Sequence, residues 1–365
     1  MKIRLFSRVG NFYFKNLKLN NSDYKNKFLK DKYYELNNFK INEAKVKLRN
    51  TYYNIFLELN KYFKIDCVIS FNFFYRAEKE LRVLDEKLGI KFIIIQKESN
   101  LYQKEIDSFK KILKVNGKFK GTKILFFSNF MKNLFLNSDV IKNSQAEVVG
   151  TSKLDLLFNS KKSKKNTILI FLMQPFRVFF DENKKSFNSR KLKAEILIFD
   201  TLKVILNLAR KYKKINFIFK AKVSADIRLK SQINLINRAN LTNCKLVLIG
   251  ASQKLIKDAK IIIGFNTTAL LEGLVAGKFV IMPYFDSYIK KFRGFVMKTN
   301  KSIIKPRSPE MLEKNISNLI NHKKEILKKN TLNSSDKKLI NYYCGNPDGK
   351  SSERLNLVLK KILSD

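Results

Sequence analysis

One stretch constrains the fold of this chain more than any other. It covers residues 260–283 and reads KIIIGFNTTALLEGLVAGKFVIMP, with two apolar runs flanking a Gly-Phe-Asn-Thr-Thr turn and an amphipathic helix. Short apolar runs on both sides of a helix predict two buried parallel strands joined by a crossover. The turn then lies at the carboxyl end of the first strand and the amino end of the helix. Open α/β sheets bind phosphorylated ligands at this place.

The same alternation of apolar runs and helical patterns recurs along the chain. It predicts an α/β fold whose sheets are parallel, because strands separated by helices form β-α-β units. The strand candidates outside the first stretch lie at residues 2–6, 67–71, 91–96, 123–128, 146–149, 167–175, 215–222 and 245–250. With 365 residues, the chain is long enough for two domains, each with a core of its own.

A charged segment without apolar periodicity, NSKKSKKN, separates two series of strands and helices. Segments of this kind are typical of linkers. We therefore expect a first Rossmann-like domain over residues 1–158, a linker over 159–166 and a second Rossmann-like domain over 167–343. The tail, residues 344–365, carries a helical apolar stripe, and we expect this last helix to cross back to the first domain.

Targeting signals and membrane spans are not apparent in the sequence. No apolar run approaches the ~20 residues that cross a bilayer. Arg4 and Arg8 interrupt the first apolar patch, whereas a signal peptide has an uninterrupted apolar core. We expect a cytoplasmic protein, which could be peripheral at the inner face of the cytoplasmic membrane.

Cysteine and histidine usage restricts the chemistry. Cys67, Cys244 and Cys344 lie far apart, in no metal-ligand spacing, and the sole histidine, His322, stands in the Lys-rich stretch NLINHKKEILKK. We expect no metal site, no disulfide framework and no histidine-based triad. Acid–base chemistry would then fall to carboxylates, lysines or tyrosines.

The charge balance is strongly basic. The chain has 74 Lys and Arg against 31 Asp and Glu, a formal net charge of +43. Such a field favours anionic partners, including sugar nucleotides and anionic membrane surfaces. Basic residues are spread along the whole chain among acidic ones, and no zinc finger, RNP-type aromatic motif or recognition helix accompanies them. We expect no specific nucleic-acid partner.

The turn of the first stretch offers hydroxyl groups and backbone N–H groups. Gly264 would let the chain turn sharply beside a ligand, and Asn266, Thr267 and Thr268 would either cap the helix or also hold a phosphate. Glu272 follows Thr268 by four residues, so the two face the same side of a helix. Its carboxylate would either be a solvated helix residue or accept two hydrogen bonds from a diol such as a ribose.

Polar residues end other predicted strands. Lys220 and Lys222 close the strand INFIFKAK, and Gln174 ends the strand TILIFLMQP. At a carboxyl edge they could reach a phosphate, a sugar or a base, although the lysines could equally be solvated residues of a Lys-rich chain. In the first half, Glu98 follows the strand KFIIIQ. It is the best placed carboxylate there for a general base, with a loop ion pair as the alternative.

Four segments of the chain carry a family resemblance: CVISFNFFY followed by LGIKFIIIQKES, AEVVGTSKLD, IIIGFNTTALLEGLVAGKFVIMP and DGKSSERLNLVLKKIL. They resemble segments of the GT-B glycosyltransferase superfamily, in the branch of surface-carbohydrate biosynthesis proteins. This branch is related to capsule and lipopolysaccharide transferases and to non-hydrolysing sugar-nucleotide 2-epimerases. The resemblance implies two Rossmann-like domains facing a cleft, with the nucleotide sugar bound by the second domain and the acceptor by the first.

The resemblance also implies roles for residues. Thr267 and Thr268 would take the diphosphate, Glu272 the ribose and Glu98 the acceptor proton. It implies a metal-independent glycosyltransferase that moves a sugar from a nucleotide-sugar donor to a glycan or glycolipid acceptor, with no further cofactor. One strand departs from the pattern, because FKAKVS stands where relatives often have a Lys-Pro-His-Pro type motif. A sugar-nucleotide epimerase on the same fold and a non-catalytic nucleotide- or polyanion-binding protein are the alternatives.

Overall fold

The structure is a computed structural model in which the chain divides into two compact units. The first comprises residues 1–99, 109–150 and 353–365, and the second comprises 100–108 and 151–352. The residues that the structure describes are 39–73, 76–99, 102–158, 166–173, 184–221, 229–289, 294, 296–321 and 332–364. The expected strand at residues 2–6 therefore lies outside the described residues.

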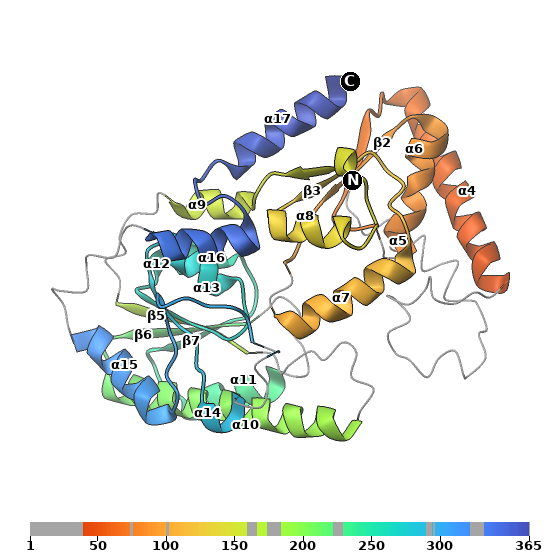
Figure 1. The fold of residues 1–365 in the computed structure, drawn as a ribbon. Coiled ribbons are helices and arrows are strands. Elements are labelled where there is room, and N and C mark those ends of the chain that lie inside the picture. The colour runs from red at the N-terminus through yellow and green to blue at the C-terminus, as the bar shows by residue number, and fades with distance from the viewer. Residues whose placement is uncertain are drawn as a thin grey trace. The chain divides into compact units, whose positions relative to one another are not determined.

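The first unit is built on a four-stranded parallel sheet in the order β1-β2-β3-β4. Figure 1 labels its two inner strands, β2 and β3. Its strands are β1 (Cys67–Ser70), β2 (Lys91–Ile95), β3 (Lys123–Phe126) and β4 (Ala146–Val148). Strand β2 is central and reads as a continuous apolar run, because both of its faces are covered. This sheet confirms the expected parallel pairing of the first half.

Helices surround this sheet. They are α4 (Phe39–Tyr62), α5 (Arg76–Lys79), α6 (Val83–Leu88), α7 (Gln103–Asn116), α8 (Asn129–Leu136) and α17 (Ser351–Ser364). The first residues of α7, up to Ser108, and of α17, up to Ser352, group with the second unit. A 3₁₀ turn at Glu80–Arg82 joins α5 to α6. Helix α6 ends at Gly89, whose left-handed φ of 64° gives the C-cap that glycine favours. Residues 353–365 group with this unit, and Ile362 of α17 packs with Ile93 and Leu125 of the sheet.

The second unit contains a six-stranded parallel sheet in the order β10-β9-β8-β5-β6-β7. Its strands are β5 (Thr167–Phe171), β6 (Asn216–Lys220), β7 (Cys244–Val247), β8 (Ile261–Ile263), β9 (Phe279–Ile281) and β10 (Ile303–Ile304). The order reverses at β5, which pairs with both β6 and β8. Open α/β sheets bind ligands at the carboxyl edge near such a reversal.

Two helical layers cover the second sheet (Figure 1). Alternate residues of β5 face opposite layers: Ile168 and Ile170 pack with α10 and α15, and Leu169 packs with α12, α13 and α16. The helices are α9 (Asp155–Phe158), α10 (Lys184–Lys211), α11 (Lys230–Ala239), α12 (Ser252–Asp258), α13 (Ala269–Val275), α14 (Asp286–Ile289), α15 (Pro309–Asn321) and α16 (Ser334–Cys344).

One of the boundaries between the units lies at Gly150–Thr151, before the linker expected at 159–166. Residues 151–158 belong to the second unit because Leu154 and Leu157 are buried in the core that contains Leu270 and Leu274 of α13. Residues 159–165 of the expected linker lie outside the described part of the chain. Among the described residues, no helix is both long enough and apolar enough to cross a membrane.

Candidate functional site

The turn between β8 and α13 has the expected order of strand, turn and helix. Gly264 is needed for packing, because a methyl group there would come within 2.9 Å of Thr267 Cγ2. Asn266 adopts a left-handed φ of 46°, and its Oδ1 accepts a hydrogen bond from the Met297 backbone N–H at 3.0 Å. The Asn266 carboxamide oxygen thus fixes a neighbouring loop.

Thr267 and Thr268 begin α13 in different ways. Thr267 Oγ1 accepts a hydrogen bond from the Ala269 N–H at 3.3 Å, while Thr268 is the residue before the first helical position. Within the described part of the chain, the backbone N–H groups of Thr267 and Thr268 donate to no protein acceptor. Helix α13 has only seven residues, so its dipole is a weaker attraction for an anion than a long helix would supply.

The carboxylate of Glu272, in the first turn of α13, is buried and forms an ion pair. The residue is 4% exposed, and its Oε1 lies 2.8 Å from the ammonium of Lys153. The same ammonium is 3.5 Å from Thr268 Oγ1, which confirms that Thr268 and Glu272 share one side of the helix. Glu272 Oε2 is buried and has no hydrogen-bond partner among the described residues. A buried oxygen of this kind retains unused acceptor capacity for a hydroxyl donor.

Lys153 is held by the segment that leads into α9. Thr151 donates a hydrogen bond through Oγ1 to the Cys344 carbonyl at 2.9 Å. Two residues beyond Lys153, Asp155 accepts the backbone N–H groups of Ser351 and Ser352 at 3.1 and 2.7 Å. Both ends of this short segment are therefore anchored within the second unit, and the ammonium carries a fixed positive charge beside Thr268.

The Cys344 thiol is buried, and the charges of Glu272 and Lys153 both act on it. Burial raises the pKa of Cys344 to about 12, and the Glu272 charge adds to this rise while Lys153 opposes it. The thiol therefore stays protonated and unreactive at neutral pH. Cys344 belongs to the buried core into which α16 packs.

Gly273, within α13, allows this helix to approach the sheet closely. A methyl group at Gly273 would come within 2.8 Å of Ile262 Cδ1 on β8 and 3.1 Å of Val280 Cγ2 on β9. The absent side chain lets the helix lie directly on both strands, which fixes the depth at which Glu272 is buried.

Among the residues expected at other strand ends of the second unit, the structure describes Lys220 alone, and Lys220 does not join this group. Lys220 ends β6, but the residue is 4% exposed and its ammonium donates to the Ala221 carbonyl next to it. Burial lowers the pKa of Lys220. Its ammonium is turned back on the chain, so a direct phosphate contact would require it to rotate. Lys222 and Gln174 lie outside the described residues.

In the first unit, Gln96 organises the carboxyl ends of β2 and β3. Its Oε1 accepts the Phe127 N–H at 2.8 Å, and its Nε2 donates to the Glu98 carbonyl at 2.9 Å. Glu98 itself is exposed at this edge. The amide thus fixes the backbone that carries the expected general base, while the Glu98 side chain faces solvent.

A second carboxylate stands near the same edge and was not expected from the sequence. Glu78 lies in α5, which follows the carboxyl end of β1, and its Oε2 is buried without a hydrogen-bond partner among the described residues. Burial raises the pKa of Glu78 to about 7, although the charge of Lys97 beyond β2 opposes this rise. A carboxylate with this pKa can take or give a proton near neutral pH.

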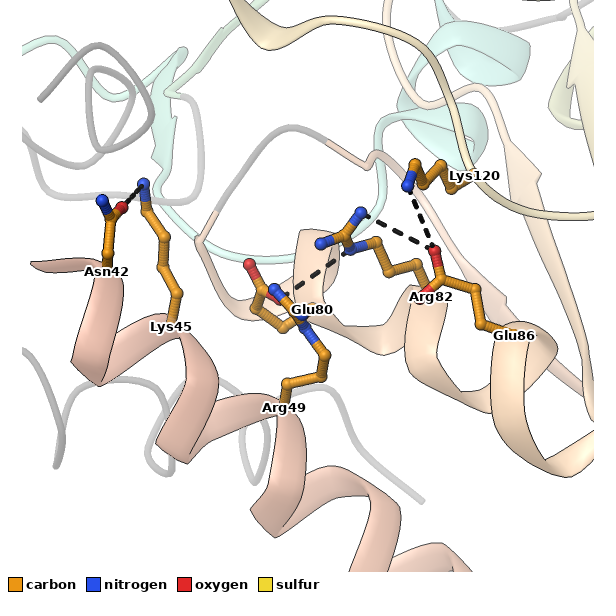
Figure 2. A network of polar contacts seen from close by, with 7 residues as sticks. All are labelled: Asn42, Lys45, Arg49, Glu80, Arg82, Glu86 and Lys120. Atoms are coloured by element: carbon orange, nitrogen blue, oxygen red, sulfur yellow. Dashed lines mark hydrogen bonds and ion pairs between the residues drawn. The ribbon is translucent and has the colours of Figure 1, made fainter. Parts of the chain in front are cut away.

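Next to Glu78, a network of charges joins α4 to the segment 80–86 (Figure 2). Glu80 is 1% exposed, and its Oε2 lies 2.8 Å from Arg49 Nε and 3.9 Å from Arg82 Nε. The network continues through Glu86 Oε1, which is 3.7 Å from both Arg82 Nη1 and Lys120 Nζ. Glu80 is therefore a structural carboxylate, and its neighbour Glu78 is the one with unused acceptor capacity.

Lys153 and Glu78 are the two functional candidates that sequence reasoning missed. Lys153 is one of many lysines, and only its contact with a residue 119 positions away distinguishes it. Glu78 stands in an ordinary helical pattern. Only its burial distinguishes it from other glutamates, and this burial depends on the packing of α4. In the described ranges, no three side chains of His, Cys, Asp or Glu gather as ligands for a metal ion.

Comparison with known proteins supports the fold. No model of a protein family matches the chain, and no curated protein matches it by sequence. The UDP-GlcNAc 2-epimerase of Neisseria meningitidis, solved with UDP-GlcNAc, is 16% identical at a TM-score of 0.50, over 87% of this chain and 82% of its own. Anabaena HepE, solved with UDP and glucose, is 12% identical at a TM-score of 0.46, over 88% and 82%.

The wall teichoic acid polymerase TagF, as its H444N variant, is 13% identical at a TM-score of 0.49, over 77% of this chain and 70% of its own. At these sequence identities, structural similarity is evidence for the fold alone. The comparison with the N. meningitidis epimerase is the one that supports the fold of this chain. The chain has an α/β fold with two parallel sheets, of four and six strands, of the GT-B type.

Proposed function

We propose that the second unit binds a nucleoside-diphosphate sugar and that the chain transfers the sugar to an acceptor hydroxyl. The observation that carries this proposal is the group formed by Lys153, Thr268 and Glu272. It combines a fixed cation, a hydroxyl and a buried carboxylate oxygen without a partner among the described residues. These groups suit the diphosphate and the ribose diol of one ligand.

The chemistry of transfer fits the residues of this group. The acceptor oxygen attacks the anomeric carbon, the bond from that carbon to the diphosphate oxygen breaks, and the acceptor proton passes to a base. Negative charge develops on the departing diphosphate. The Lys153 ammonium and the N–H groups of Thr267 and Thr268 would stabilise this charge, as preorganised donors do in other active sites.

The base would come from the first unit, for which we propose the acceptor role. Glu98 is the candidate from sequence position, and Glu78 is the candidate from its environment, since its pKa is raised to about 7 by burial. A glycan or glycolipid of a bacterial surface polysaccharide is the acceptor class that the sequence resemblance suggests. The net charge of +43 would favour peripheral contact with an anionic membrane during such synthesis.

Epimerisation of the donor is the second candidate function. The N. meningitidis protein of the same fold is a 2-epimerase that was solved with UDP-GlcNAc, so this ligand is a suitable first probe. An epimerase converts the sugar nucleotide without an acceptor, whereas a transferase releases free nucleoside diphosphate only when an acceptor or water takes the sugar. The two activities therefore give different products from the same incubation.

Binding is measured first, by calorimetry with UDP-GlcNAc, UDP-glucose, and GDP-, CDP- and CMP-sugars. We expect one nucleotide class to bind, and Glu272→Gln and Thr268→Ala each to weaken that binding by roughly tenfold, the effect of losing one good hydrogen bond to a charged group. Glu313→Gln is the matched control, because this exposed glutamate of α15 belongs to the same unit and its replacement changes charge equally.

Equal affinity of the wild type and both site variants would refute the proposed site. Equal stabilisation by every polyanion tested, lost in high salt, would instead assign a non-catalytic polyanion-binding protein. With the binding nucleotide known, product analysis by NMR separates transfer from epimerisation. Appearance of the 2-epimer without an acceptor would assign the epimerase.

A further inference from the structure

A pocket opens at the amino edge of the second sheet, opposite the edge that carries Thr268 and Glu272. It lies beside the starts of β5, β6 and β8 and the ends of α10 and α15, and we call it the amino-edge pocket. Because the sheet is parallel, its amino and carboxyl edges are opposite, so this pocket is separate from the proposed donor site. Its volume is about 560 Å³, within the range of about 300–1,000 Å³ for ligand pockets.

The lining of the amino-edge pocket is strongly basic. Lys211, Lys213 and Lys214 come from the turn between α10 and β6, and Lys260 precedes β8. No Asp or Glu occurs among the lining residues in the part of the chain that the structure describes. The apolar part of the lining is isoleucine, including the buried Ile168 and Ile261. Lysines beside an apolar surface attract an anion more strongly than lysines surrounded by water.

Stabilisation of a helix end by positive charge explains the position of one of these lysines but not of the others. Helix α10 ends at Lys211, where a cation offsets the partial negative charge of the helix end. Lys213 and Lys214 follow the helix, and the dipole effect falls off within the last turn. Their charges therefore remain available to a ligand.

The basic turn is held in one conformation by a single side chain. The Asn243 amide donates hydrogen bonds to the carbonyls of Ala209, Tyr212 and Ile215, at 3.0, 3.2 and 3.0 Å. These three acceptors lie before, within and after the run Lys211–Lys214. The turn is thus ordered before any ligand arrives, which lowers the entropy cost of binding.

Uncharged hydrogen-bonding groups complete the lining. The Asn321 amide donates to the Tyr212 hydroxyl oxygen at 3.4 Å, and the Lys211 ammonium lies 5.6 Å from the centre of the Tyr212 ring. Hydrogen bonding with Ser317 lowers the pKa of Tyr212. A tyrosine hydroxyl and an amide beside several ammonium groups form the kind of donor set that recognises phosphate oxygens.

We propose that the amino-edge pocket is a second anion site, which binds phosphate groups through Lys211, Lys213 and Lys214. It goes beyond the proposed function, because it uses residues that the donor site does not. The group that binds is a phosphate. It belongs either to a free ligand such as pyrophosphate or to a lipid headgroup, and both present the same chemistry to the pocket.

The test is a footprint of lysine reactivity on the full chain. The protein is acetylated with an N-hydroxysuccinimide ester, and each lysine is quantified by mass spectrometry with and without inorganic pyrophosphate. Parallel samples contain vesicles of phosphatidylcholine alone or with 30% phosphatidylglycerol, at the same salt concentration. We expect several-fold protection of Lys211, Lys213 and Lys214, by pyrophosphate if the natural source is free and by the anionic vesicles if it is lipid.

Two triple variants test whether binding depends on the position of the lysines or only on the net charge of the protein. Replacing Lys211, Lys213 and Lys214 by Gln should weaken binding of the protecting probe by about tenfold, since each ion pair near a surface contributes modestly. The second variant replaces Lys254, Lys337 and Lys338 by Gln, because these lysines are exposed in the same unit but do not line the pocket. It changes net charge equally and should leave the affinity within twofold.

The outcomes separate this proposal from the proposed donor site. Equal protection of the pocket lysines and the control lysines, or equal effects of both triple variants, would overturn the amino-edge pocket as a phosphate site. Lys153 reports on the donor site in the same samples, because its side chain is 39% exposed. UDP-GlcNAc should protect Lys153 and not Lys211, so one site can fail while the other stands.

Discussion

Lys153 Nζ lies 2.8 Å from Glu272 Oε1, although 119 positions separate the two residues in the chain. The ion pair links the short segment before α9 to α13, and it compensates a carboxylate whose side chain is only 5% exposed. Removal of one partner of such a pair leaves a buried charge without compensation. Lys153 therefore has a structural effect that can be measured apart from any ligand.

We expect Lys153→Ala to lower the free energy of unfolding by about 2 kcal/mol, less than for a fully buried pair because the lysine is partly exposed. The double variant Lys153→Ala with Glu272→Gln should recover most of this loss, since no uncompensated charge remains. Urea denaturation measures both, with Lys254→Ala as the control for loss of an exposed lysine. A double variant no more stable than Lys153→Ala would contradict the ion-pair explanation.

The raised pKa of Glu78 predicts a pH-dependent stability. Between about pH 4.5 and pH 7, the folded state keeps a proton that the unfolded state has released. Stability contributed by Glu78 is thus present at low pH and is lost as the pH rises through 7, by up to about 3 kcal/mol. The Glu78→Gln variant should lack this part of the decline in urea denaturation followed from pH 4.5 to 8.

The control for this titration is Glu353→Gln, which removes an exposed carboxylate of α17 in the same unit. It should keep the wild-type slope. If Glu78→Gln kept that slope as well, burial would not be what controls the protonation of Glu78, and its proposed role as a base would lose its support.

The charge network of the first unit predicts a large effect of one arginine. Arg49→Ala removes the cation that lies 2.8 Å from the Glu80 carboxylate, a residue that is 1% exposed, whereas Arg82 stays 3.9 Å from it (Figure 2). We expect a loss of about 3 kcal/mol in the free energy of unfolding. Lys61→Ala, which breaks an exposed pair with Glu58 on the same helix, should cost less than about 0.5 kcal/mol. Similar losses in thermal or urea unfolding would show that the burial of Glu80 is not decisive.

The packing of α13 on the sheet gives a further prediction. Gly273→Ala adds a methyl group 2.8 Å from Ile262 Cδ1, so overpacking of about 1–3 kcal/mol should exceed the gain in helix propensity of about 1 kcal/mol. Combining it with Ile262→Val removes that methyl group and should restore part of the stability. A double-mutant cycle in urea measures the coupling, and strictly additive effects would contradict the close contact.

Local patterns in the sequence predicted much of the second unit. The stretch 260–283 gave β8, α13 and β9 because short apolar runs and a turn are encoded within a few residues of each other. Helix α15 likewise follows from local sequence: Ser308 Oγ accepts the Met311 N–H at 3.3 Å, and Pro309 is the first residue of the helix. Helix α7 lies outside the elements expected from the sequence, although Ile106, Phe109 and Leu113 follow a helical period.

The site was predictable only in part, for a physical reason. Thr268 and Glu272 face the same side because residues four positions apart in a helix lie about one turn from each other, and this spacing can be read from the sequence. The partner of Glu272 depends on how a distant segment folds, and nothing local marks Lys153. The orientation of Lys220 likewise follows from burial at the end of β6, which turns its ammonium onto the Ala221 carbonyl. The roles assigned to Lys222 and Gln174 stay predictions.

Asp155 accepts the first two N–H groups of α17, across 196 and 197 positions of the chain. Two backbone donors at the start of this helix are therefore satisfied by a carboxylate that is distant in the sequence. During folding, the first turn of α17 can become stable only after residues near 155 have reached their final place. The first turn of α17 should therefore form late in folding. Its formation depends on long-range closure of the chain rather than on the intrinsic helix propensity of its own residues.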